Sequence, residues 1–147
     1  MKFKYAIEHK ILSETCPPEE YEPKDLEAYR WVFDEIEISN NFTPQYFKNP
    51  KRFITMDDAL KCKSMALSMW NSKEASLKRF NFLRDNLLGK RAYKVLGTKL
   101  AFGNLNEELG VSSDIEENGH FSHHPEENSD YSKVSVSYTH LTLPTKA

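Results

Sequence analysis

The stretch ALSMWNSKEASLKRFNFLRDNLLG, residues 66–89, decides the fold predicted for this chain. A short apolar run, Ala66–Trp70, leads into a helix for which Ser72 is the N-cap, because a serine hydroxyl accepts a hydrogen bond from an otherwise unpaired backbone N–H. Glu74 lies in the first turn, where the helix dipole favours a carboxylate, and Gly89 follows the last turn, where it can adopt a left-handed cap. The pattern predicts an extended segment followed directly by a helix.

The predicted helix spans about Ser72–Leu88 and has one apolar face. Phe82 breaks the pattern, because it falls on the polar side of the helix. We interpret it either as an aromatic anchor for a partner or a nucleic-acid base, or as an ordinary exposed apolar side chain. At 3.6 residues per turn the shared face contains Ser76, Leu77, Phe80, Leu83, Leu87 and Leu88.

Bulk properties indicate one globular domain. The chain has 147 residues, with 39% apolar and 29% charged side chains, which is enough to bury a core. We predict a single α+β domain over residues 1–135, in which a small, mostly antiparallel sheet packs against the central helix.

The segments before the central helix give weaker patterns. Met1–Leu12 fits either a strand or a short helix, and the prolines and glutamates of Ser13–Lys24 predict an exposed loop. Leu26–Phe33 predicts a helix capped by Asp25, with an apolar stripe on one side. Ser39–Pro50 predicts a long structured loop packed through its aromatic residues.

Later segments predict the partners of the sheet. A short helix is expected from Thr55 to about Lys63, and the residues from there to Trp70 fit an extended segment better than a continued helix. Gly97 and Gly103 favour a bent strand or a hairpin pair within Tyr93–Leu105. The turn Asn118-Gly119 introduces a strand, His120–His124, which Pro125 ends.

The two cysteines, Cys16 and Cys62, are too few for a disulfide framework, so reduced thiols in a cytoplasmic protein are expected. Charges interrupt any signal-peptide core in the first twelve residues, and no uncharged run is long enough to span a membrane.

Charge is unevenly distributed along the chain. Residues 47–100 carry 13 Lys and Arg against 4 Asp and Glu, whereas both flanking segments are acidic. Our first functional hypothesis is a non-enzymatic interaction module whose basic central face binds an acidic protein or nucleic acid. A solvated face that neutralises its own flanks is the alternative interpretation. The candidate binding residues are Lys78, Arg79, Phe82, Arg84, Lys90, Arg91 and Lys94.

A helix-turn-helix is excluded for residues 96–114, which resemble one superficially. Residues 101–130 contain eight acids and no lysine or arginine, and a recognition helix there would repel DNA phosphates.

Three histidines fall within five residues, at positions 120, 123 and 124. On a strand His120 and His124 share a face but lie roughly 13 Å apart, while His123 points to the opposite side. No metal site and no cofactor are therefore predicted, since no further Cys-x-x-Cys or His-Glu-x-x-His spacing is present.

The second functional hypothesis is a small transferase or hydrolase that acts on a nucleotide-like substrate. His120 is the candidate general base, because it follows a turn at the start of a strand. Ser68 and Ser72 flank Trp70 at the strand-to-helix junction and are the candidate partners of this base. The hypothesis requires the base and a serine to lie on the same side of the sheet.

Residues 136–147 form a tail that is predicted to be non-native. VSYTHLTLPT, residues 136–145, resembles the translated end of a transposase-delivered sequencing adapter over ten consecutive residues. The resemblance implies that the natural chain continues differently after Ser135 and that the domain is truncated. His140 therefore carries no functional argument.

Overall fold

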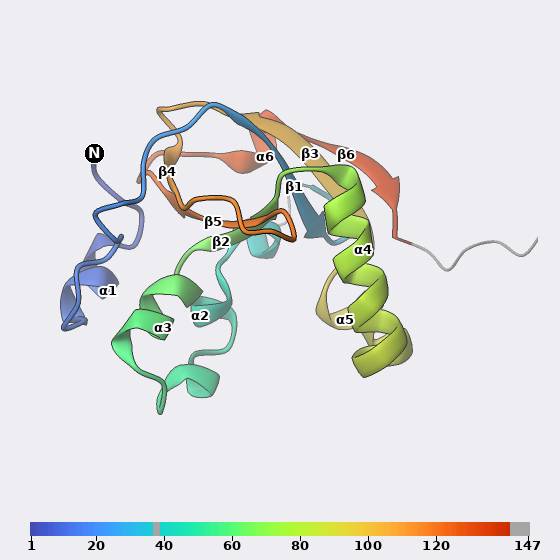
Figure 1. Cartoon of the computed structure of the whole chain (residues 1–147), viewed down its shortest axis with the longest axis horizontal. Coiled ribbons are helices and arrows are strands. Elements are labelled where there is room, and N and C mark those ends of the chain that lie inside the picture. The colour runs from blue at the N-terminus through green and yellow to red at the C-terminus, as the bar shows by residue number, and fades with distance from the viewer. Residues whose placement is uncertain (37–38, 142–147) are drawn as a thin grey trace, which may run out of the picture.

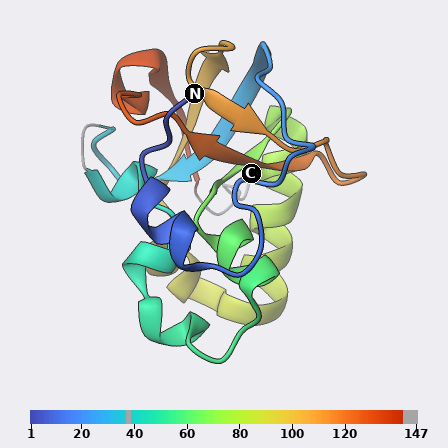
Figure 2. The same cartoon turned by 90° about the vertical axis from the view of Figure 1, so that its left-hand side faces the viewer.

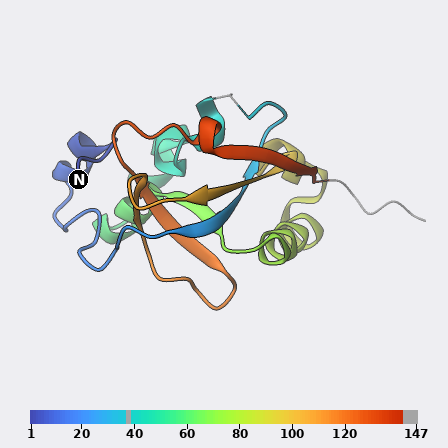
Figure 3. The ribbon, with the colours of Figure 1, turned by 90° about the horizontal axis from the view of Figure 1, so that it is seen from above.

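A six-stranded antiparallel sheet organises the fold of this computed structural model, which describes residues 1–36 and 39–141, with the backbone alone at 39 and 137–140. Its strands lie in the spatial order β4-β5-β2-β1-β3-β6 (Figure 1). Seen from above, the strands fan out across one another, as expected for a twisted sheet (Figure 3). The strands are β1 (Leu26–Val32), β2 (Leu67–Trp70), β3 (Lys99–Leu105), β4 (Gly110–Ser112), β5 (His120–Pro125) and β6 (Ser135–His140).

Most of the helices lie on one side of the sheet, in two groups. Figures 1 and 2 show α1, α2 and α3 below one part of the sheet and α4 with α5 below another. Within the described ranges, no helix is long and apolar enough to cross a bilayer. The α-helices are α1 (Ala6–Ile11), α2 (Gln45–Lys48), α3 (Asp58–Ser64), α4 (Lys73–Leu83), α5 (Ala92–Val95) and α6 (Tyr131–Val134).

The strand-to-helix unit predicted from residues 66–89 is confirmed. Strand β2 ends at Trp70, and the Ser72 hydroxyl accepts a hydrogen bond of 3.1 Å from the backbone N–H of Ala75. After α4 the chain widens into a π-helical turn, Arg84–Leu88. This turn rotates the following side chains away from the 3.6-residue pattern, and Leu87 is consequently 69% exposed. The prediction that Leu87 lies on the buried face is therefore wrong.

Two apolar clusters cover the two faces of the sheet. Trp31 contacts Phe80 edge to face and donates its indole N–H to the carbonyl of Ser76, which fixes α4 against the sheet. This cluster contains Phe80, Ala92, Leu100 and Leu141, and the cluster on the opposite face contains Ala28, Leu67, Met69, Leu105, Leu109, Phe121 and Tyr131.

Residues 26–33 form strand β1 rather than the predicted helix. Ala28 and Val32 are buried on one face of the sheet, while Tyr29 and Trp31 pack on the other, which is the period of a strand. β1 pairs with β3 over seven residues, from Leu26 to Val32, and these long-range pairings outweigh the local helical pattern.

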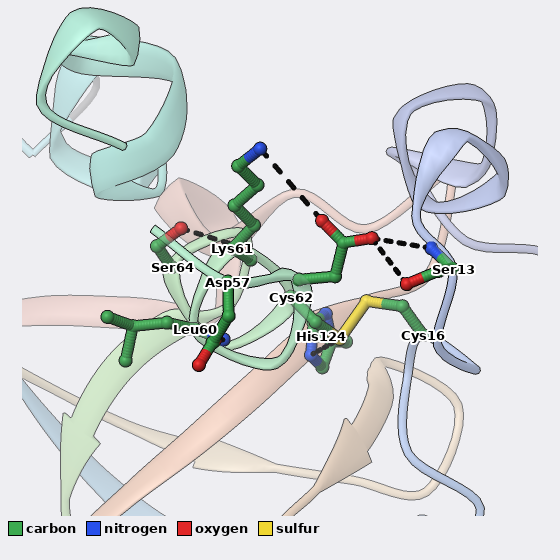
Figure 4. The surroundings of a disulfide bond; sticks show 9 residues. Ser13, Cys16, Asp57, Leu60, Lys61, Cys62, Ser64 and His124 are labelled. Atoms are coloured by element: carbon green, nitrogen blue, oxygen red, sulfur yellow. Dashed lines mark hydrogen bonds and ion pairs between the residues drawn. A yellow bond between two sulfur atoms is a disulfide. The ribbon is translucent and has the colours of Figure 1, made fainter. Parts of the chain in front are cut away.

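Cys16 and Cys62 form a disulfide, which corrects the prediction of two reduced thiols (Figure 4). The 13–24 loop passes beside α3 and places the two Cα atoms 5.7 Å apart, although 46 positions separate them in sequence. Ser13 fixes this approach, because its backbone N–H and its hydroxyl both donate to the Asp58 carboxylate at 2.7 Å. Sequence spacing alone does not reveal such a contact.

The remaining elements settle the alternatives left open by the sequence. The N-terminal segment contains helix α1, and the Asp57 carboxylate caps α3, close to the start predicted for a helix there. The expected bent strand is a short helix, α5, followed by β3. In the tail, β6 pairs with β3 along the sheet edge, while residues 142–147 lie outside the described part of the chain.

Candidate active site

The candidate active site lies where β2 and β5 pair. Ser68 is directly opposite Ser122, and Trp70 is directly opposite His120. Because directly paired residues of antiparallel strands share a face, Ser68 and His120 project from the same side of the sheet, towards α3 and α4. The sequence-based condition for an enzyme site is therefore met for this pair.

Ser68, His120 and Glu116 are joined in a chain of hydrogen bonds. Ser68 Oγ lies 2.5 Å from His120 Nε2, and a Glu116 carboxylate oxygen pairs with His120 Nδ1. Trp70 packs edge to face against the imidazole at 4.9 Å between ring centroids. The His120 side chain is only 16% exposed, so its ring has little freedom to turn away from its two partners.

A tight turn brings Glu116 to the histidine. The Gly119 N–H donates to the Glu116 carbonyl, and the Glu116 N–H donates to the His120 carbonyl, both at 2.8 Å. Gly119 has φ of 87°, and a Cβ there would lie 2.5 Å from the Asn71 side-chain oxygen. Only glycine tolerates both the positive φ and the close approach of the Asn71 side chain. The sequence prediction does not include Glu116, which lies four residues before His120 across this turn.

An open pocket of about 270 Å³ lies beside the Ser68 hydroxyl. Two of its lining side chains are cationic, Arg52 and Lys63, and none is acidic. The Arg52 guanidinium lies over the Phe53 ring at 5.5 Å, at the wall of this pocket. The lining thus combines an apolar wall with positive charge, which suits a small anionic ligand. The lining residues are Gln45, Arg52, Phe53, Met56, Leu60, Lys63, Ser64, Ala66, Ser68, His120 and Ser122.

Ser72 does not join His120 in this pocket. Its hydroxyl caps α4, and the side chain lines a different depression, of about 510 Å³, between α4 and the turn that precedes β5. Lys78, Arg79 and Phe82 line that same depression together with three glutamates. Ser68 is therefore the serine that the fold brings to the candidate base.

One residue of the predicted basic face, Arg84, is buried in the fold. Arg84 is 6% exposed, and its guanidinium donates to Asp85 at 2.8 Å and to the Tyr93 hydroxyl at 3.3 Å. Asp85 is the main cause of the raised pKa of Arg84. Arg84 is thus a buried structural cation, and its assignment to an exposed face is wrong. Phe82 is half exposed beneath the Arg79 guanidinium, while Lys90, Arg91 and Lys94 are exposed.

The other two histidines of the 120–124 segment are buried at separate places. His123 bonds to the Ser112 hydroxyl at 2.8 Å and to the Tyr131 hydroxyl at 2.6 Å, on the face opposite His120. Burial lowers the pKa of His123 to about 4, which keeps this ring neutral as a structural link. His124 packs against the Cys16–Cys62 disulfide (Figure 4).

No protein family matches the sequence, and no curated protein or solved structure matches the chain.

Proposed function

We propose that the protein is a small hydrolase or transferase that uses Ser68 as a nucleophile and His120 as its general base. The observation that supports this proposal is the continuous hydrogen-bonded chain from Ser68 through His120 to Glu116. A nucleophile, a base and a carboxylate that orients the base define nucleophilic catalysis in several unrelated folds.

Each group has a defined part in the proposed reaction. The Ser68 hydroxyl attacks the electrophilic carbon or phosphorus of an ester while His120 Nε2 accepts its proton. Glu116 holds Nδ1–H and stabilises the imidazolium that forms. His120 then returns the proton to the leaving alkoxide, and the covalent Ser68 ester passes to water or to another hydroxyl acceptor. No net charge accumulates on the protein over the cycle.

The pocket indicates the substrate class. Arg52 and Lys63 provide two positive charges without a carboxylate among the lining side chains. Cations at these positions fit the phosphate of a nucleotide-like ester and stabilise negative charge that develops on the substrate oxygen. The apolar wall formed by Phe53 and Met56 fits the organic part of such a substrate.

This proposal takes precedence over the interaction module. The exposed cations of α4 share their depression with Glu74, Glu116 and Glu117, so positive charge is locally compensated there. Arg84 is buried, which further reduces the positive charge available to a partner. A salt-dependent binding face formed by Lys78 and Arg79 remains a prediction of the sequence alone.

The test is the hydrolysis of chromogenic phosphate and carboxylate esters by the purified chain. Ser68→Ala and His120→Asn are expected to lower kcat/KM by about 10²–10⁴-fold, the range for loss of acid–base catalysis. Glu116→Gln is expected to lower kcat more than it changes KM, because it removes the orientation of the base without changing the pocket.

Ser64→Ala is the matched control, since Ser64 lines the same pocket but donates its hydroxyl to the Lys61 carbonyl. It should retain wild-type activity. Esterase activity that survives in Ser68→Ala would contradict the proposal, and so would the absence of turnover with every ester of both classes.

A further inference from the structure

A second cluster of reactive side chains lies where α1, the 13–24 loop, α3 and β5 meet (Figure 4). One ring nitrogen of His9, one of His124 and the sulfur of Cys16 lie within 4.8 Å of one another. Cys62 completes the group, because its sulfur is bonded to that of Cys16 and lies 3.9 Å from His124 Nε2. Four potential metal ligands therefore converge from four separate segments.

Two of these ligands carry unsatisfied buried nitrogens. In the described part of the chain, the buried side-chain nitrogen and oxygen atoms without a hydrogen-bond partner are His9 Nε2 and His124 Nδ1. His9 is 5% exposed and His124 is fully buried, and their rings meet edge to face at 5.2 Å. Leaving a buried polar atom unpaired costs about 1–3 kcal/mol. Both such atoms belong to the two histidines of this cluster, so each ring has one unpaired nitrogen buried there.

We propose that reduction of the Cys16–Cys62 disulfide converts this cluster into a Zn²⁺ site with His9, Cys16, Cys62 and His124 as its four ligands. Two thiolates and two imidazoles are a donor set that zinc prefers, and four protein ligands define a closed, structural site. The site is separate from Ser68 and its pocket and does not depend on the function proposed above.

A dithiol can act as the reductant of the Cys16–Cys62 disulfide. The dithiol breaks the S–S bond, is itself oxidised to a disulfide, and leaves two cysteine thiols on the protein. Zn²⁺ then binds both sulfurs as thiolates, and two protons pass to solvent. The two thiolate charges cancel the charge of the ion, so the buried site is electrically neutral.

The residues around the cluster leave a path for an ion and pack aromatic rings against both histidines. His9 and Cys16 line an open depression of about 600 Å³ beside α1, through which an ion can reach the sulfurs. Phe3 packs against His9 at 6.2 Å and Tyr21 packs against His124 at 5.7 Å between ring centroids. Zinc at about 2.3 Å from each sulfur holds the two thiolates about 3.8 Å apart, a separation that side-chain rotation supplies once the bond is broken.

The two states provide alternative cross-links for the same region. In the oxidised chain, the disulfide ties the 13–24 loop to α3 alone. In the reduced chain, zinc joins the loop and α3 to α1 and β5 as well. The proposed metal thus replaces a covalent link wherever a reducing environment removes it, as in the cytoplasm expected from the sequence.

The experiment uses the full chain, oxidised or reduced with a phosphine that does not bind zinc. After incubation with ZnCl₂ and desalting, elemental analysis is expected to find one zinc per reduced chain and none per oxidised chain. Co²⁺ added to the reduced chain is expected to give the absorption of tetrahedral cobalt bound to thiolates. His9→Ala and His124→Ala are expected to weaken zinc binding by at least about 100-fold.

His120→Ala is the matched control, because His120 lies on the same strand and face as His124 but outside the cluster. It should bind zinc as the wild type does. His9→Gln provides a second, conservative variant whose folding is checked by circular dichroism. Equal zinc in the oxidised and reduced chains, no zinc in the reduced chain, or wild-type affinity in both folded His9 variants would overturn the proposal.

Discussion

Breaking the Cys16–Cys62 disulfide in a zinc-free solution is expected to lower the free energy of unfolding by about 4 kcal/mol. The magnitude follows from the 46-position separation of the two cysteines, since a cross-link of that span removes loop-closure entropy from the unfolded chain. The folded state keeps its shape, because Ser13 continues to donate two hydrogen bonds to Asp58. The loss therefore arises mainly in the unfolded ensemble.

Urea denaturation with and without reductant, in the presence of a chelator, measures this change. With a slope of about 2 kcal/mol per molar urea, the midpoint is expected to fall by about 2 M. The double variant Cys16→Ser, Cys62→Ser is the control, and reductant should leave its midpoint unchanged. A difference between oxidised and reduced chains below about 1 kcal/mol would refute the reasoning.

Three further predictions concern single side chains. Phe121→Ala is expected to cost about 3–5 kcal/mol in urea denaturation, because the ring is fully buried, whereas Phe82→Ala at a half-exposed ring should change stability by under about 0.5 kcal/mol. Ser72→Ala should cost about 1 kcal/mol through loss of the α4 cap, measured by thermal unfolding, without lowering esterase activity. Burial, with a smaller contribution from Arg30, lowers the pKa of Lys48 to about 8, below the unfolded value of about 10.4, so the charged form destabilises the fold at pH 7. Lys48→Met should therefore stabilise the chain by about 1 kcal/mol at pH 7, after allowance for partial exposure, and this advantage should disappear as the pH rises from 8 to above 10.5.

The sequence predicts an element correctly wherever residues close together in the chain determine its structure. Ser72 caps α4 and the Asn118-Gly119 turn introduces β5, because both depend on a hydroxyl or a backbone conformation within a few residues. The helix predicted for Leu26–Phe33 is wrong, since the place of this segment between β2 and β3 depends on residues far away in the chain. The predicted burial of Leu87 is wrong, because a π-helical turn does not follow from the 3.6-residue period.

The sequence predicts only part of the candidate site, namely the residues whose positions depend on local structure. The sequence predicts Ser68 and His120 as candidates from their positions at element ends, and the pairing of β2 with β5 brings them into hydrogen-bond contact. The sequence does not predict Glu116, because only the folded turn places its carboxylate against the imidazole. The sequence does not predict the cluster of His9, Cys16 and His124 either, since it joins segments with no shared sequence motif.

Covalent labelling of the nucleophile tests the central claim most directly. The intact protein is treated with a fluorophosphonate that reacts with activated serines, and the modified peptide is identified by mass spectrometry. We expect one adduct per chain, located on Ser68, and at least about 100-fold slower labelling in His120→Asn. An adduct on another residue, or labelling of Ser68 at the wild-type rate without the imidazole, would contradict a serine activated by His120.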